Sequence, residues 1–161
     1  MKDVAEFEIA KAAFAELEAR FPSLEMIREP DAPIEVSIHL PVQQGLSQAV
    51  WLGLNNNDEL HFFVGHFWHE WFPCTEQVKV REYIDAVAGY LSGRYRVVEH
   101  YKGTRCIRAE LQSPVGSLWK TVGTRSNLWA ILPGKKISKV LRNDAQPGIQ
   151  PDGPASGVSA G

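Results

Sequence analysis

An aromatic-rich stretch at positions 60–72 constrains the fold more than any other part of the chain. It reads Leu-His-Phe-Phe-Val-Gly-His-Phe-Trp-His-Glu-Trp-Phe, and it is bounded by the turn-forming run Asn55 to Asp58 and by Pro73. Aromatic and β-branched residues between such turn signals favour a β-strand over a helix. Strand side chains alternate between two faces, and here both faces are largely apolar, so we expect both to be covered.

The strand before this stretch predicts which face meets the core. If Leu54 pairs with Leu60 across the asparagine-rich turn, the even-numbered positions of both strands form one aliphatic and aromatic face. We expect that face to pack against helices. The odd-numbered face then gathers Trp51, Phe63 and Phe67 with His61.

Gly65 allows a second arrangement of the same stretch. A glycine inside a strand pattern often marks a β-bulge, and a bulge would exchange the two faces beyond it. His66, Trp68 and Glu70 would then lie on the side of His61. The residues that we expect to line a ligand site or an interface are Trp51, His61, Phe63, His66, Phe67, Trp68 and His69.

The remaining pattern predicts an α+β fold. Apolar residues recurring every three or four positions predict helices over 3–21 and 75–91, and Gly93 suits the left-handed position after the second helix. Strands are predicted at 34–40, 46–54, 60–72, 94–101, 105–112 and 117–123. The order α-β-β-β-α-β-β-β favours antiparallel sheet or sheets with helices packed on one face, and it allows an αβββ architectural repeat.

The chain of 161 residues is short enough to suggest one α+β domain, which we place at 1–133. Residues 134–161 differ in character. A short basic segment at 135–142 is expected to be a short helix. From Asn143 the chain is rich in Gly, Pro and Ser, and we expect a flexible tail because it cannot bury enough apolar surface to order itself.

Charge and composition limit the kinds of partner and the cellular compartment that we expect for this protein. The net charge of −2 gives no overall attraction to nucleic acid or to an anionic membrane. No run approaches the roughly 18 apolar residues of a membrane span, and the first residues lack the pattern of a signal peptide. Two cysteines cannot form a disulfide framework. We therefore expect a cytoplasmic protein with reduced thiols and with neither nucleic acid nor membrane as a partner.

No catalytic motif is found in the sequence. It lacks a glycine-rich phosphate loop, a nucleophile elbow and a paired-carboxylate motif, so we expect no cofactor and favour a protein that is not an enzyme. His66, His69 and Glu70 have a spacing that converges on a helix, but on a strand the two histidines point to opposite faces, and no metal is expected.

The two cysteines allow a further hypothesis, that of a redox or metal-binding protein. Cys74 precedes the second predicted helix, where the helix dipole favours a thiolate. A three-residue loop at 102–104 would place His100 opposite Cys106, which is a Cys–His pair on paper. We expect both thiols to be inert.

Two functions of the aromatic-rich strand remain. The first is a non-catalytic binding or interaction protein whose aromatic sheet face is an interface for a protein partner or for a second copy, as in a homodimer. The alternative is a small-molecule-binding α+β fold, which could be an enzyme, with a pocket lined by Trp51, Phe63, Phe67 and a histidine. The sequence names neither the partner nor the ligand.

Overall fold

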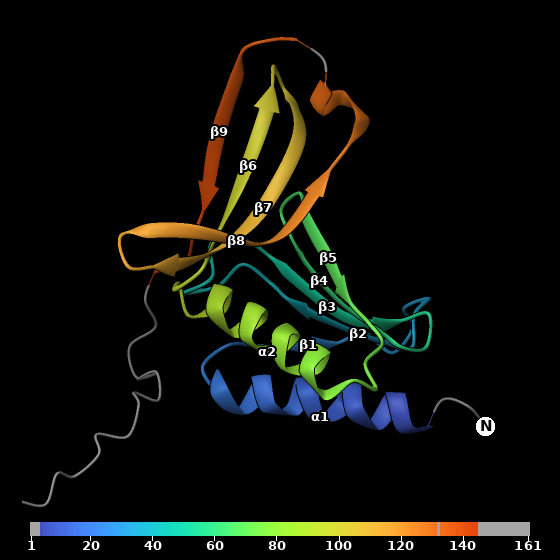
Figure 1. Cartoon of the computed structure of the whole chain (residues 1–161). Coiled ribbons are helices and arrows are strands. Elements are labelled where there is room, and N and C mark those ends of the chain that lie inside the picture. The colour runs from blue at the N-terminus through green and yellow to red at the C-terminus, as the bar shows by residue number, and fades with distance from the viewer. Residues whose placement is uncertain (1–3, 132, 145–161) are drawn as a thin grey trace, which may run out of the picture.

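The computed structural model describes residues 4–131 and 133–144 (Figure 1). Within them lie two helices, α1 (Val4–Arg20) and α2 (Gln77–Leu91), and two antiparallel sheets. The first sheet has the order β1 (Ile27–Arg28), β2 (Val36–Leu40), β3 (Val50–Asn55), β4 (Glu59–Val64), β5 (Phe67–Trp71). The second has the order β8 (Leu118–Ser126), β7 (Arg105–Val115), β6 (Arg96–Lys102), β9 (Lys136–Leu141), with a short 3₁₀ helix, η1 (Leu128–Ile131), after β8. The predicted α+β class is confirmed.

Both helices cover one face of the first sheet (Figure 1). The pairing of Leu54 with Leu60 is confirmed, and the even-numbered residues of β3 and β4 are buried in the core. Tyr83 of α2 lies edge-on to Phe14 of α1, with ring centroids 6.3 Å apart, so the two helices share the same core. The left-handed conformation of Gly93, with φ of 76°, ends the second helix as expected.

The aromatic-rich stretch is a hairpin, so the single strand predicted over 60–72 is wrong. β4 ends at Val64, and β5 begins at Phe67 after a two-residue turn in which Gly65 has a φ of 56°. Such turns need a positive φ, which glycine adopts without strain. The turn exchanges the faces, as a bulge would have done, and brings Trp68 and Glu70 to the side of His61.

The second sheet joins the same core at its base and extends away from the helices (Figure 1). The helix predicted within 135–142 is wrong, because residues 136–141 form β9 and pair antiparallel with β6. Without β9, this side of β6 would leave a row of backbone groups unpaired, which is a strong reason for pairing. Each helix is followed by antiparallel strands, but the strand orders of the two sheets differ. The flexible tail was predicted to begin at Asn143, but Asn143 is buried and its side-chain amide donates to the Tyr90 carbonyl at 3.1 Å, so the prediction is wrong at this residue. The rest of the predicted tail, from residue 145, lies outside the described residues.

Glu99 of β6 connects the two sheets. It is 1% exposed, and its Oε1 accepts hydrogen bonds from the backbone N–H of His66 (2.7 Å) and from the His66 ring (3.1 Å). Its Oε2 accepts the hydroxyl proton of Tyr101. Burial raises the pKa of Glu99, but the hydrogen bonds from Tyr101 and His66 together lower it by more than burial raises it. This carboxyl therefore has a pKa below its usual value. The tip of the β4–β5 hairpin is thus held against the second sheet.

No helix among the described residues is both long and apolar enough to span a bilayer.

Candidate functional site

The face of the first sheet that points away from the helices carries a row of four rings. They are His39 of β2, Trp51 of β3, Phe63 of β4 and Trp68 of β5, and each is the cross-strand partner of the next. Directly opposed residues share a face of the sheet, which is why one ring from each strand stands in line. We call these four side chains the aromatic row.

The aromatic row divides into two stacks. His39 and Trp51 are stacked with centroids 4.7 Å apart and planes 10° apart. Phe63 and Trp68 are stacked at 5.5 Å and 26°. Trp51 and Phe63 therefore each stack on the neighbour that lies away from the other. Both remain partly exposed, at 42% and 39%. The middle of the aromatic row therefore has a partly exposed ring on each side.

A cavity of about 420 Å³ lies over the aromatic row. Such a volume is typical of small-molecule sites, as is a mainly apolar wall with a few polar groups. Its lining residues come from the loop before β2 and from β2 to β5: Glu29, Ala32, Pro33, Ile34, Ser37, Trp51, Leu52, Gly53, Asn55, His61, Phe63 and Trp68.

The loop before β2 forms one wall of the cavity. Ile34 lies over Gly53, where a β-carbon would come within 2.8 Å of the Ile34 Cδ1, so the absence of a side chain at residue 53 makes room for it. The loop is tied to β2 because the Ser37 hydroxyl donates to Glu29 Oε2 at 2.7 Å and Glu29 N–H donates to the Ser37 carbonyl at 2.9 Å. This wall is therefore defined before any ligand arrives.

His61 lies in the floor of the cavity in a defined protonation state. The Trp68 indole Nε1, which can only donate, donates to His61 Nδ1 at 3.1 Å. The neutral ring therefore carries its proton on Nε2, and it donates that proton to Glu59 Oε2 at 3.0 Å. Burial raises the pKa of Glu59, but hydrogen bonds from Asn56 and His61 lower it more, and the net pKa is below the usual value.

The same residues resemble a metal-ligand group in composition only. Single ligand atoms of Glu59, His61 and Glu70 all lie within 4.8 Å of one another. A metal ion needs a nitrogen lone pair, but Nδ1 of His61 accepts from Trp68 and Nε2 carries the proton given to Glu59. The arrangement is that of a hydrogen-bonded chain rather than of a metal centre.

Four of the predicted site residues meet at this cavity: Trp51, His61, Phe63 and Trp68. Phe67 does not, and its predicted place beside them is wrong. The hairpin turn puts Phe67 on the helix-facing side, where it is fully buried against Phe62 at 5.7 Å.

The other two predicted residues lie apart from the aromatic row. His69 pairs with Phe62 on the helix-facing side, and burial lowers its pKa. His66 forms the hairpin turn and contacts Glu99 of the second sheet. The sequence pattern did not identify Glu29, Ser37 and Gly53 as site residues, because a loop that folds back over a sheet leaves no periodic signal. The alternation of polar residues at 35–39 was the only indication of the sheet face that lines the cavity.

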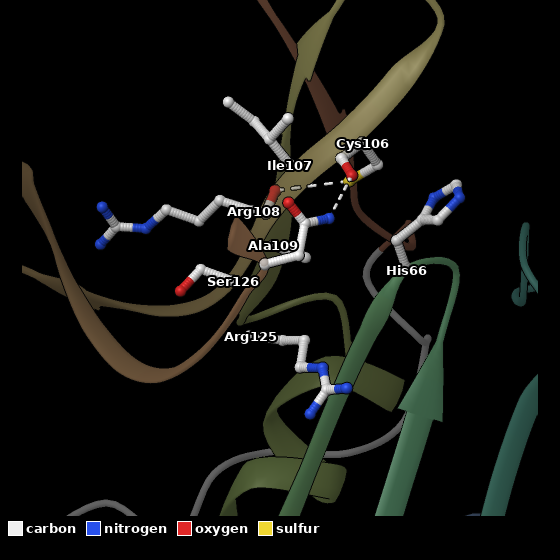
Figure 2. Close-up of a pocket in the computed structure, with 8 residues that line it drawn as sticks. His66, Cys106, Ile107, Arg108, Ala109, Arg125 and Ser126 are labelled. Carbon is white, nitrogen blue, oxygen red and sulfur yellow. Dashed lines mark hydrogen bonds between the residues drawn. The ribbon is translucent and has the colours of Figure 1, made fainter. Parts of the chain in front are cut away.

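A second, smaller cavity of about 170 Å³ lies between the hairpin turn and the second sheet (Figure 2). The turn between β6 and β7 holds two residues, not the predicted three, and pairs Lys102 with Arg105. Tyr101 rather than His100 therefore lies opposite Cys106, and the predicted Cys–His cross-strand pair is wrong. Figure 2 shows the guanidinium groups of Arg108 and Arg125 directed away from Cys106. Burial and the charge of Glu99 raise the pKa of Cys106. This cavity therefore offers neither an activated thiolate nor converging positive charges.

Cys74 is likewise not an activated nucleophile. It is buried, and burial together with Asp58 and Glu6 raises its pKa to about 11. The expectation that the start of the helix would favour a thiolate is wrong, because desolvation outweighs the dipole here.

Comparisons of the chain with protein-family models, with curated proteins and with solved structures find no match. The cavity over the aromatic row is therefore the observation that supports a function.

Proposed function

We propose that this protein binds a small molecule with a flat ring, and that the ring is inserted into the aromatic row between Trp51 and Phe63. The observation that carries the proposal is the division of the row into two stacks below a cavity, with a partly exposed ring on each side of the division. An inserted ring would make the row continuous across four strands. Offset stacking adds about 0.5–1.5 kcal/mol per aromatic pair beyond the burial of apolar area.

The walls of the cavity support binding because they are held in place from behind. Trp68 is fixed by its hydrogen bond to His61 and by Arg125 of β8, whose Cζ lies 4.3 Å from the ring centroid. Trp51 is fixed by its stack on His39. A site whose side chains are already ordered loses little conformational entropy on binding, which leaves more of the contact energy as affinity.

The neutral, flat dye PRODAN tests this function. We expect its emission to rise and shift to shorter wavelength with the protein, and we expect Trp51→Ala and Phe63→Ala to weaken binding by about tenfold or more, as the loss of one stacked ring and its buried area implies. Trp129→Ala is the matched control, since Trp129 of η1 is also a half-exposed tryptophan, at 50%, but lies outside the cavity. Absence of dye binding, or equal loss in the control, would refute the proposal.

The same face favours a second candidate, which is self-association. Ile27 of β1, at 41% exposure, is the cross-strand partner of His39 and extends the apolar surface beyond the row. A homodimer closing over this face would bury Ile27, Trp51 and Phe63 together. Light scattering at the highest soluble concentration separates the two uses. A dimer that Trp51→Ala dissociates favours the interface, and a monomer that binds PRODAN rules it out.

A further inference from the structure

We propose that the ligand of this cavity is an organic cation, whose flat ring or ring substituent carries the positive charge; this inference rests on the proposed small-molecule function. The charges that surround the aromatic row support this inference, and they are separate from the stacking that supports binding itself.

Three carboxylates stand around the cavity. Glu29 lines it, and Glu59 and Glu70 lie beside His61 on the same face of the first sheet. Glu29 accepts from Ser37, and Glu59 accepts from Asn56 and His61. All of these donors are uncharged, because the hydrogen bond from Trp68 fixes His61 as a neutral ring.

No lysine or arginine within residues 4–131 and 133–144 makes an ion pair with these three carboxylates. Among the same residues, the one contact of these carboxylates with an ionisable base is that of Glu59 with His61. Arg28, the last residue of β1 before the loop, points to the face of the sheet that the helices cover, and it pairs with Glu18 of α1 at 3.0 Å. Among the described residues, these three carboxylates therefore have no lysine or arginine as an ion-pair partner, and a cationic ligand would supply one.

Arg125 is the one cation in contact with the row in the described part of the chain, and its position shows how these rings bind positive charge. Its guanidinium lies over Trp68, 4.3 Å from the ring centroid. Phe63 stacks on Trp68 as well, so both faces of that indole are in use. The rings left for a ligand are Trp51 and Phe63, which can attract a cation through the same negative ring face.

A neutral ring would gain only the stacking and the burial, whereas a cation gains the attraction of the ring faces and of the carboxylates as well. The attraction between the cation and the ring faces alone is expected to raise affinity several-fold, and the attraction of the partly desolvated carboxylates adds to this gain. An anion would meet three carboxylates and is expected to be excluded.

The test compares N-methylquinolinium with lepidine, a neutral molecule of nearly the same shape, at slightly alkaline pH where lepidine is uncharged. Binding to the full chain is followed by tryptophan fluorescence and by calorimetry. We expect N-methylquinolinium to bind about tenfold tighter or more, and we expect this preference to fall as salt is added.

Glu70→Gln removes one charge beside His61, at the edge of the cavity, while it keeps the shape of the side chain. It is expected to reduce the preference for the cation about threefold or more, with lepidine affinity unchanged. Glu82→Gln is the matched control, because it makes the same change in net charge on α2, where Glu82 pairs with Lys79. An equal effect of the two variants would show that the preference arises from overall charge, and it would overturn the inference.

The outcomes separate this inference from the function on which it rests. If PRODAN binds but N-methylquinolinium and lepidine bind equally, the cation preference is refuted and the small-molecule site stands. If none of the three probes binds, both proposals fail together. If lepidine binds more tightly than N-methylquinolinium, the carboxylates do not select charge and the inference is wrong.

Discussion

Replacement of Glu99 tests the account of how the two sheets are joined, since this buried carboxylate accepts from the backbone of the hairpin turn and from Tyr101. A hydrogen bond to a charged group contributes about 1.5–3 kcal/mol, so Glu99→Ala is expected to cost about 3–6 kcal/mol through the loss of these two bonds. The His66 ring is well exposed, and its contact with Glu99 adds less than about 1 kcal/mol.

Glu99→Gln separates charge from shape. The amide oxygen can accept the His66 backbone proton, and the amide NH₂ can donate to the Tyr101 oxygen, so both partners stay satisfied. Only the charge-assisted part of the two bonds is lost, which predicts a cost of about 1–2 kcal/mol. Tyr101→Phe removes one donor and is expected to cost a similar amount. In that background Glu99→Ala should cost less than in the wild type, because the two residues share a bond.

The pH dependence of the same comparison has a definite sign. The folded pKa of Glu99 lies below its usual value of 4.5, so the carboxylate contributes stability above that pH and loses it as the pH falls through the folded pKa. The gap between wild type and Glu99→Gln is therefore expected to shrink below about pH 4.5. Glu59 and Glu110 have lowered pKa values too, but they are present in both proteins and cancel in the difference.

Urea unfolding followed by fluorescence and circular dichroism gives the free energies of unfolding. A cost of Glu99→Ala below about 1 kcal/mol at neutral pH, or a gap between wild type and Glu99→Gln that widens on acidification, would contradict this role of Glu99.

Other changes test the fold at single positions. Gly65→Ala should cost about 3 kcal/mol or more, because a β-carbon there would lie 2.4 Å from a carboxylate oxygen at a φ of 56°; Gly103→Ala, at a φ of 60° with nothing within 4 Å, should cost only about 1–2 kcal/mol in thermal unfolding. Phe67→Ala should cost about 3–5 kcal/mol, and a loss below about 1 kcal/mol would contradict its buried place. In native protein a thiol reagent should modify the partly exposed Cys106 and leave Cys74 unmodified until the chain unfolds; rapid modification of both would contradict the burial and raised pKa of Cys74.

The sequence predicted those parts of the fold that depend on local pattern. The asparagine-rich turn set the register of β3 and β4, and the resulting pairing of Leu54 with Leu60 keeps the apolar positions of both strands on one face. The hairpin turn at Gly65 was harder to recognise, since both faces of the stretch are aromatic and the alternation gave no sign of a break. Once the turn is known, the burial of Phe67 and the place of Trp68 on the opposite face, beside Phe63, follow from it.

The parts that could not be predicted depend on contacts between distant segments. β9 forms because an edge of β6 is open to it, and its own residues, such as Lys136 and Lys139, do not form a strand pattern. The cavity wall at Glu29 exists because the loop folds back over a strand that has a glycine where Ile34 needs room. Neither β9 nor the cavity wall has a signature in the local sequence, so each can be recognised only in the tertiary structure.

Mapping of backbone amide chemical shifts during a titration with PRODAN is the strongest test of a ligand site over the aromatic row, because it reports where the dye binds as well as whether it binds. The account predicts the largest changes in β3 to β5, at Gly53, His61 and Phe63, together with the loop that carries Ile34. Changes confined to η1 or to the second sheet, or no changes at saturating dye, would contradict a ligand site over the aromatic row.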